Sequence, residues 1–182
     1  MNASKFASQL AGTAPSITGL VKSGLTIEGA QQIVNHSIAT PRVAPLAIRF
    51  STGSNPDALL ELISLYDVSG LEIGMISFVD KPADYGDYLQ IAKVELDSLV
   101  IYQNGEIRVV DWQQLDHCMW RCARNSELFL EALLMTNRFL TLTILNADID
   151  SDEDYALETA SVIANVAGGS EYLSFYQMLF GV

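Results

Sequence analysis

The stretch Tyr88–Asp111 limits the possible folds of this chain more than any other, because it predicts successive β-strands joined by a tight turn. Asn104-Gly105 is a strong signal for a two-residue type I′ hairpin loop, in which both central residues need a positive φ. Such a loop fixes the register so that Tyr102 faces Ile107, and side chains then alternate between the two faces of each strand. The face expected in the core carries Val100, Tyr102, Ile107 and Val109.

The opposite face of this hairpin is mixed, and we expect it to be partly covered. It is polar near the turn, and further away it carries Leu99, Ile101 and Val110. In the preceding strand, Leu89–Glu95, the apolar residues change phase near Ala92. A β-bulge predicts such a change of phase, and so does a strand that is buried on both faces.

Helical patterns lie on both sides of this region. Residues 1–24 are small and only weakly helical, with Phe6 and Leu10 at helical spacing. The longer expected helices are Ile27–His36, Asn55–Asp67, Ser126–Leu140, Glu153–Ala167 and Glu171–Phe180. Their expected end signals are Thr26, Asn55 before Pro56, Asn125 or Ser126, Gly168-Gly169 and Ser170. Further strands are expected at Leu46–Phe50 and Gly74–Val79, a polar loop at Asp80–Asp87, and no clear element in Trp112–Arg124.

Length and charge set the class of protein. With 182 residues the chain is long enough for one domain with its own core. We expect an N-terminal helical or extended region, residues 1–54, that is continuous with an α+β core domain, residues 55–182. The net charge of −12 disfavours binding to nucleic acid or to an anionic membrane, and it favours a basic protein partner. The alternative is that the acidity only keeps the protein soluble.

Three features predict a cytoplasmic protein. Two cysteines, Cys118 and Cys122, are too few for a disulfide scaffold, so we expect reduced thiols. The first twenty residues contain no apolar run of the kind that a secretory signal has. The most apolar region, Phe129–Leu145, is interrupted by charged and amide side chains and is not expected to span a membrane.

No metal, cofactor or catalytic group is predicted. Alternating carboxylates at Asp148–Asp154 suggest a calcium loop, but the glycine and glutamate positions of an EF-hand hold Glu153 and Thr159. These carboxylates fit better near a helix N-terminus, where the helix dipole favours them. The sequence His117-Cys118 with Cys122 gives three of the four ligands of a structural zinc site, and the other histidine, His36, is distant in sequence.

Acidic and aromatic residues alternate between two expected strands, and they form the predicted partner-binding site. Its residues are Asp80, Asp84, Tyr85, Asp87 and Tyr88. Aromatic side chains with complementary charge are typical of the surface that meets a protein partner. Two alternatives remain open: the carboxylates solvate a loop, or paired carboxylates act in general acid and base catalysis.

Several segments resemble the SUKH superfamily, which includes bacterial immunity proteins and a fungal cell-wall assembly regulator. They are Gly70–Gly74, the strand start at Gly86-Asp87-Tyr88, and the helix Ser126–Leu134, within a resemblance that covers roughly residues 57–140. The resemblance implies an α+β fold with a twisted, mostly antiparallel sheet flanked by helices. Together with the residue patterns, this predicts a single domain with a central Asn-Gly hairpin, flanked by N-terminal and C-terminal helices. It also implies binding to a protein, and in the bacterial branch neutralisation of a toxin, often a nuclease.

The resulting expectation is a non-enzymatic, SUKH-like immunity protein that covers a basic toxin without a cofactor. Two other functions are kept open. One is a scaffold or homo-oligomeric regulator, in which the aromatic face of Glu171–Phe180 packs against a second copy. The other is a small enzyme that uses the loop carboxylates, which predicts a concave pocket with a strongly shifted carboxyl pKa.

Overall fold

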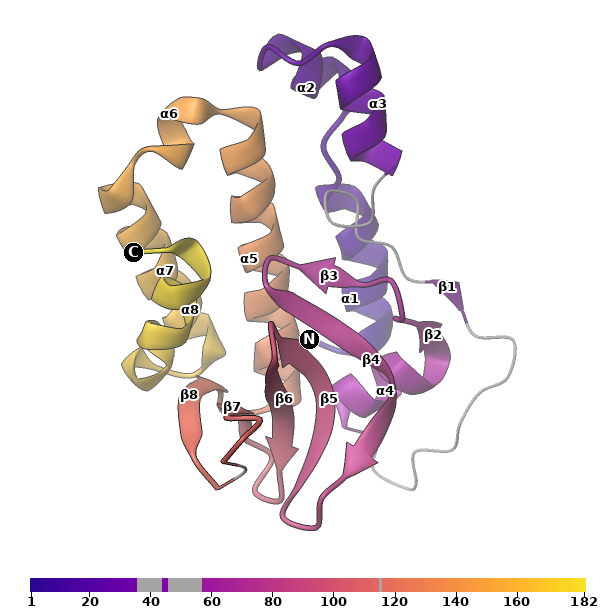
Figure 1. Ribbon diagram of the computed structural model, residues 1–182, viewed down its shortest axis with the longest axis vertical. Coiled ribbons are helices and arrows are strands. Elements are labelled where there is room, and N and C mark those ends of the chain that lie inside the picture. Colours follow the sequence, from indigo (N-terminus) through magenta and orange to yellow (C-terminus); the bar gives the residue numbers. More distant parts are fainter. Residues whose placement is uncertain (36–43, 46–56, 115) are drawn as a thin grey trace.

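The computed structural model describes residues 1–35, 44–45, 57–114 and 116–182, and it has an α+β fold (Figure 1). The expected strand Leu46–Phe50 and the expected helix start at Asn55-Pro56 lie outside the described residues. The described α-helices are α1 (Ala3–Leu10), α2 (Ile17–Lys22), α3 (Ile27–Asn35), α4 (Ala58–Leu65), α5 (Ser126–Leu145), α6 (Ala147–Asp150), α7 (Glu153–Ala167) and α8 (Leu173–Phe180). Short 3₁₀ turns are η1 (Ala11–Thr13) and η2 (Ser170–Tyr172). The described strands are β1 (Ala44–Pro45), β2 (Tyr66–Asp67), β3 (Glu72–Ile73), β4 (Ile76–Asp84), β5 (Tyr88–Val94), β6 (Asp97–Tyr102), β7 (Ile107–Val110) and β8 (Cys118–Ala123).

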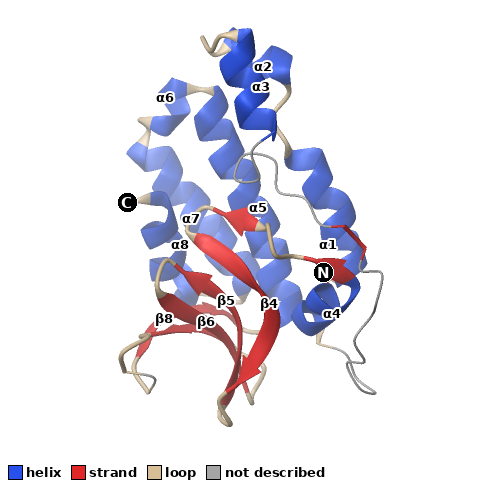
Figure 2. Cartoon of the chain, turned by 45° about the vertical axis from the view of Figure 1, so that its right-hand side comes forward, coloured by secondary structure: helices blue, strands red, loops and turns tan. Residues whose placement is uncertain are grey.

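One antiparallel sheet organises the molecule. Strands β3 to β8 pair in the order of the sequence, and β1 pairs with β2 in a separate two-stranded ribbon. The sheet is curled, and α5, α7 and α8 lie on one side of it (Figure 2). Helices α2 and α3 stand away from the sheet, beyond one end of α5 (Figure 1). The expected fold class, an antiparallel sheet flanked by N-terminal and C-terminal helices, is therefore confirmed.

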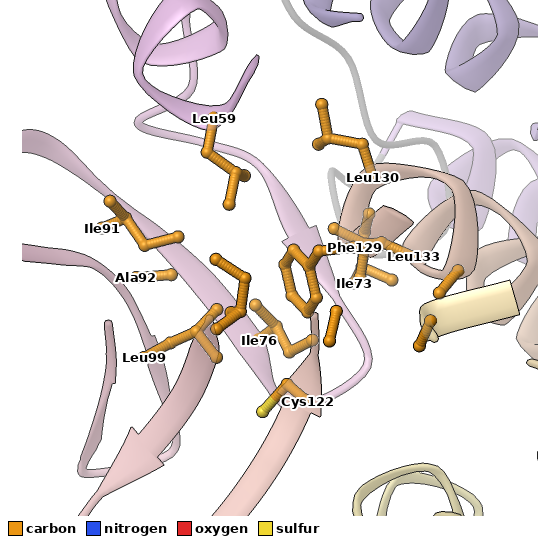
Figure 3. Close-up of a cluster of buried hydrophobic side chains, with 14 of the residues drawn as sticks. Leu59, Ile73, Ile76, Ile91, Ala92, Leu99, Cys122, Phe129, Leu130 and Leu133 are labelled. Carbon is orange, nitrogen blue, oxygen red and sulfur yellow. The ribbon is translucent and has the colours of Figure 1, made fainter. Parts of the chain in front are cut away.

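The main core lies between the sheet and the helices, with α5 at its centre. Phe129 of α5 lies among Ile73, Ile76 and Leu133 in Figure 3, and all four side chains are buried. Helix α1 adds to the same core with Ala3, Phe6 and Leu10, which are fully buried. The start of the chain is thus an integral part of the core.

The central hairpin forms, but its register differs by one residue from the expected one. Ile101 pairs with Ile107, and the amide of Tyr102 donates to the carbonyl of Glu106 at 3.0 Å. The loop has three residues, Gln103–Gly105, and its last residue has a φ of +83°, which suits glycine. The two-residue loop predicted from Asn-Gly is therefore wrong.

A shift of one residue changes which side chains of a strand share a face with the partner strand. The core face of the hairpin is made by Leu99, Ile101, Ile107 and Val109. Val100 and Tyr102, which were expected in that core, point to the other side of the sheet, where Val100 belongs to a second buried cluster. In β5 the register shifts between Gln90 and Ala92, which favours the bulge of the two alternatives and explains why Ile91 and Ala92 are both buried in the main core.

Two other segments of the sheet differ from the expectation. Strand β4 continues to Asp84, so most of the predicted polar loop Asp80–Asp87 is strand. Its register against β5 is irregular between Phe78 and Ala83, a stretch that contains Pro82, and proline cannot donate a ladder hydrogen bond. The unassigned segment Trp112–Arg124 contains β8, whose two register shifts against β7 hide the alternation of a regular strand.

The helix predictions are largely correct. Helix α7 has the expected bounds, Glu153–Ala167, and Gly168 ends it with a φ of +130°. The predicted caps at Thr26 and Asn125 form, because their side chains accept backbone hydrogen bonds from Gly29 and Leu128. Three details are wrong: α4 ends at Leu65, α5 continues to Leu145, and the last α-helix begins at Leu173 without a cap from the side chain of Ser170. The described cap of α4 is Asp57, which also accepts a hydrogen bond from Ser126 of α5 at 2.5 Å.

The β5–β6 turn leads to a prediction about backbone strain. Glu95 has a φ of +55°, and it is the one non-glycine residue with positive φ in the described part of the chain. A side chain in that conformation costs about 1 kcal/mol, part of which the greater chain entropy of unfolded glycine offsets. We expect Glu95→Gly to raise the free energy of unfolding by about 0.5 kcal/mol, measured by urea denaturation.

Leu96 provides the matched control, because it is the next residue of the same turn and is 70% exposed. Its φ is not positive, so Leu96→Gly relieves no strain and is expected to lower the free energy of unfolding by roughly 0.5–1 kcal/mol. Equal losses in the two glycine variants would contradict the strain at Glu95.

Candidate functional site: a tyrosine-lined hollow

The face of the sheet opposite the main core carries a small cluster of its own. Tyr88, Val100 and Val110 are buried there, and Tyr102 packs against them. The cluster follows from the strand register, because Tyr88 of β5 pairs with Tyr102 of β6. Two tyrosines on adjacent strands are thereby fixed side by side on a face that the helices of the core do not cover.

An open hollow of about 510 Å³ lies on this face. It is lined by Tyr85, Asp87, Tyr88, Tyr102, Arg108 and Asp116. Tyr85 and Asp87 come from the β4–β5 turn, and Asp116 comes from the β7–β8 connection. Three segments that are distant in sequence thus supply the floor and the rim.

The tyrosines form a continuous row of rings. The ring centroids of Tyr85 and Tyr88 are 5.4 Å apart, and those of Tyr88 and Tyr102 are 5.5 Å apart. The guanidinium of Arg108 lies over the ring of Tyr102, 4.4 Å from its centroid. Both spacings are typical of aromatic pairs, and the Arg108 geometry is that of a cation–π contact.

The hydroxyl of Tyr88 is unusual. Tyr88 is only 7% exposed, and its Oη has no hydrogen-bond partner within the described ranges. Burial raises the pKa of this phenol, and Tyr102, Tyr85 and Asp87 raise it further. The hydroxyl is therefore neutral at physiological pH and can both donate and accept a hydrogen bond.

The positive charge of Arg108 is already paired. Its Nε donates to Oε2 of Glu106 at 2.8 Å, and Nε of Arg121 donates to Oε1 of the same carboxylate at 2.6 Å. Burial raises the pKa of Glu106, but the hydrogen bonds and charges of the two arginines outweigh it and hold that pKa below its ordinary value. This bridge fixes the floor beside the hollow. One carboxylate balances only one of the two guanidinium charges, so the bridge as a whole keeps one net positive charge.

The rim carboxylates, by contrast, are unpaired. Asp87 and Asp116 are exposed, and neither side chain accepts a hydrogen bond or forms an ion pair with the described residues. Tyr85 beside them is 51% exposed. Together with the net positive charge of the bridge, the two carboxylates leave one net negative charge at the hollow, next to an accessible aromatic ring.

The structure brings together three of the five predicted site residues. Tyr85, Asp87 and Tyr88 line the hollow. Asp84 is the last residue of β4, next to this turn, and its Oδ1 accepts a hydrogen bond from Gly86 N at 2.8 Å, so it stabilises the turn itself. Asp80 lies elsewhere, at a separate hollow of about 300 Å³ that Tyr66, Asp67 and Ser69 also line.

Sequence reasoning missed Tyr102, Arg108 and Asp116. Tyr102 was assigned to the core because the hairpin register was wrong by one residue. The correct register places Arg108 opposite Val100, on the same face. Asp116 lies in the segment without a clear pattern, so no signal in the sequence connects it with Tyr85.

The other candidate groups of residues, the acidic segment before α7 and the two cysteines, have structural roles. Asp152 caps α7 by accepting a hydrogen bond from Tyr155 N at 2.9 Å, as expected of carboxylates near a helix N-terminus. In the described part of the chain no three His, Cys, Asp or Glu side chains are grouped as a metal ion requires. Cys118 and Cys122 lie on a strand, and burial raises the pKa of both thiols, which disfavours the nucleophilic thiolate.

The aromatic face of the C-terminal helix is not on the surface. Tyr172, Phe175, Tyr176 and Leu179 are buried in the main core. Tyr176 Oη donates to the carbonyl of Cys122 at 2.9 Å, which ties α8 to β8. A homo-oligomer remains a prediction, but these side chains do not offer it an exposed surface.

Helix α5 has the length and composition of a membrane span, the one such case among the described helices. Half of its apolar window is buried against the rest of the protein, as in a core helix.

The enzyme alternative predicted a carboxyl group with a strongly shifted pKa. At Asp67 and Glu106 the pKa is lowered, which favours the ionised form over a proton donor.

A comparison of the chain with models of protein families, with curated proteins and with solved structures found no match.

Proposed function

We propose that this protein is a non-enzymatic binding module of the SUKH type, which acts as an immunity protein by covering a basic protein toxin, possibly a nuclease. The observation that carries the proposal is the hollow with exposed Tyr85 and with Asp87 and Asp116, which have no partner among the residues that the structure describes. An aromatic side chain framed by unpaired charge has the composition of a protein-binding surface. The partner of such a surface carries the opposite charge.

The charge of the whole chain supports the same partner. A net charge of −12 attracts a basic protein over long distances and raises the rate of encounter. A nuclease presents positive charge around its substrate groove because it binds phosphates. An acidic protein placed over that groove excludes the substrate without any chemistry of its own.

The rim of the hollow can be tested against a second acidic surface of equal charge. The rim variant carries Asp87→Lys and Asp116→Lys, and the control variant carries Glu131→Lys and Glu158→Lys on the exposed sides of α5 and α7. Asp84 is left unchanged because its carboxylate holds the turn. Both variants change the net charge equally, so a general electrostatic effect changes the retention of a partner by both variants to the same extent.

The wild type and both variants are immobilised, exposed to a lysate of the source organism and eluted in steps of salt. We expect a basic protein that the wild type and the control retain and that the rim variant releases at low salt. With the purified partner, the association rate of the rim variant is expected to fall about tenfold at low ionic strength. Equal retention by all three proteins, or equal loss from both variants, would contradict a binding site at the rim.

A toxicity assay of the captured protein then distinguishes an immunity protein from a scaffold. The captured protein is expressed in a host cell with or without the wild-type chain. We expect growth arrest that the wild type relieves and the rim variant does not. A captured protein that is harmless when expressed alone would overturn the immunity function and favour the scaffold.

A further inference from the structure

We propose that the hollow is a subsite for one positively charged side chain of the partner, and that an arginine fits it best. The inference rests on the proposed function for the source of that side chain, and it adds the chemistry of recognition. The guanidinium stacks on the row of tyrosine rings while its N–H groups donate to the carboxylates of Asp87 and Asp116.

Charge favours a cation as the occupant. The two rim carboxylates have no partner among the described residues, whereas Arg108 already donates to Glu106 at 2.8 Å and shares that carboxylate with Arg121, which leaves one net negative charge at the hollow. An anionic occupant would face both carboxylates without an uncommitted positive group among the residues that line the hollow. A cation meets two negative charges and aromatic faces, which also attract cations.

The arrangement within the hollow already contains one example of the proposed contact. Arg108 lies over Tyr102 at 4.4 Å, so the tyrosine row accepts a guanidinium at one end. Tyr85, at the other end of the row, is the exposed ring. A partner arginine over Tyr85 would repeat at the open end the geometry that Arg108 has at the closed end.

The buried hydroxyl of Tyr88 is the independent sign of a ligand. A buried polar atom without a protein partner destabilises the folded protein by about 1–3 kcal/mol, so such an atom calls for a partner from outside the chain, either water or a ligand. Tyr88 lines the hollow between Tyr85 and Tyr102, and its neutral oxygen can accept a hydrogen bond from a guanidinium.

The hollow has room for a whole arginine side chain. Its volume of about 510 Å³ lies within the range of roughly 300–1,000 Å³ that small ligand pockets have. Arginine is favoured over lysine because its planar fork stacks on an aromatic ring and pairs with a carboxylate at the same time. The compact ammonium group of lysine cannot stack on a ring and form a forked pair with a carboxylate at the same time.

The test uses the free protein and a small probe, so it does not depend on a partner. N-acetyl-argininamide is titrated into the ¹⁵N-labelled chain, and amide shifts are followed by NMR. N-acetyl-lysinamide is titrated in parallel to test which cationic group the hollow prefers, and N-acetyl-glutamate to test whether the charge must be positive. We expect saturable shifts at Tyr85–Tyr88, Tyr102 and Asp116 with the arginine probe, weaker shifts with lysine and none with glutamate.

Three variants test the residues that make the contact. Asp87→Asn and Tyr85→Ala are each expected to lower the affinity for the arginine probe about tenfold, since each contact contributes on the order of a factor of ten in affinity. Asp80→Asn, from the other hollow, is the control and is expected to leave the affinity unchanged. The spectra themselves show whether each variant is folded. Absence of shifts, similar shifts with glutamate, or equal effects of all three variants would overturn the subsite.

The two proposals can fail separately. If the probe does not bind but the rim variant loses a basic partner, the binding function stands and the arginine subsite is wrong. If the probe binds at the hollow but no basic protein is captured there, the subsite stands and the toxin-binding function is wrong.

Discussion

Replacing Phe6 by alanine is expected to lower the free energy of unfolding by about 3–4 kcal/mol. Phe6 is fully buried, and α1 packs against both α4 and α5. Removing the ring deletes apolar contacts and leaves a cavity between elements that cannot easily close over it. Urea denaturation followed by circular dichroism measures the loss.

Ile27→Ala is the control within the same N-terminal part of the chain, because Ile27 is 70% exposed. Its effect on the free energy of unfolding is expected to remain within about 0.5 kcal/mol. If Phe6→Ala were as mild as Ile27→Ala, α1 would not be part of the core in solution. The pair of variants thus tests whether residues before the sheet belong to the same cooperative unit.

Replacing Glu106 by glutamine is expected to lower the free energy of unfolding by about 2 kcal/mol at neutral pH. The carboxylate is buried and accepts hydrogen bonds from Arg108 and Arg121, and Tyr172 Oη lies 3.4 Å away. Hydrogen bonds to a charged group contribute about 1.5–3 kcal/mol. Arg121 is 46% exposed, so solvent reduces its share.

The pH dependence follows from the direction of the pKa shift. The pKa of Glu106 is lower in the folded chain than its ordinary value of 4.5, so the stabilising charge is fully present above that value. The advantage of the wild type over Glu106→Gln is therefore constant near neutral pH. It decreases as the pH falls below about 4.5 and through the folded pKa, where the carboxylate becomes protonated.

Glu158→Gln serves as the matched control, because Glu158 is exposed on α7. It is expected to change stability by less than about 0.5 kcal/mol at any pH. Denaturation curves at several pH values test both statements. A difference between wild type and Glu106→Gln that stays the same into strong acid would show that lost packing, and not lost charge, explains the variant.

The helices were predictable because their signals are local. Asn125 sits three residues before the amide that it caps, and the apolar stripe of Glu153–Ala167 repeats within the helix itself. Local hydrogen bonds and helical spacing need no knowledge of the rest of the chain. Where tertiary packing extends a helix, as α5 is extended to Leu145, the sequence pattern ends too early.

The strands were harder because their faces depend on single-residue registers. Asn104-Gly105 correctly marked a turn, but the sequence does not distinguish a two-residue from a three-residue loop there. That one residue moved Val100 and Tyr102 from the core to the opposite face. In β8 the register shifts disrupt the alternation, and a strand without alternation has no clear sequence pattern.

The candidate site was predictable only where it is continuous in sequence. Tyr85, Asp87 and Tyr88 are neighbours in the chain, and their composition alone suggested a binding surface. Arg108 and Asp116 join them through pairing across β5, β6 and β7, which no local pattern specifies. The same long-range pairing separates Asp80 from the site.

The packing of α1 against α5 has a consequence for the order in which the protein assembles during synthesis. Each strand of the main sheet pairs with its neighbour in sequence, so the sheet can form as the chain leaves the ribosome. Helix α1 is made before the sheet, but α5 begins only at Ser126, and the hydrogen bond from Asn137 of α5 to Thr13 next to α1 comes later still. Helix α4 can cover part of the apolar face of α1 earlier, but the side that packs against α5 must wait until more than a hundred further residues have been made. During that interval this side of α1 is exposed to chaperones and to aggregation in the nascent chain.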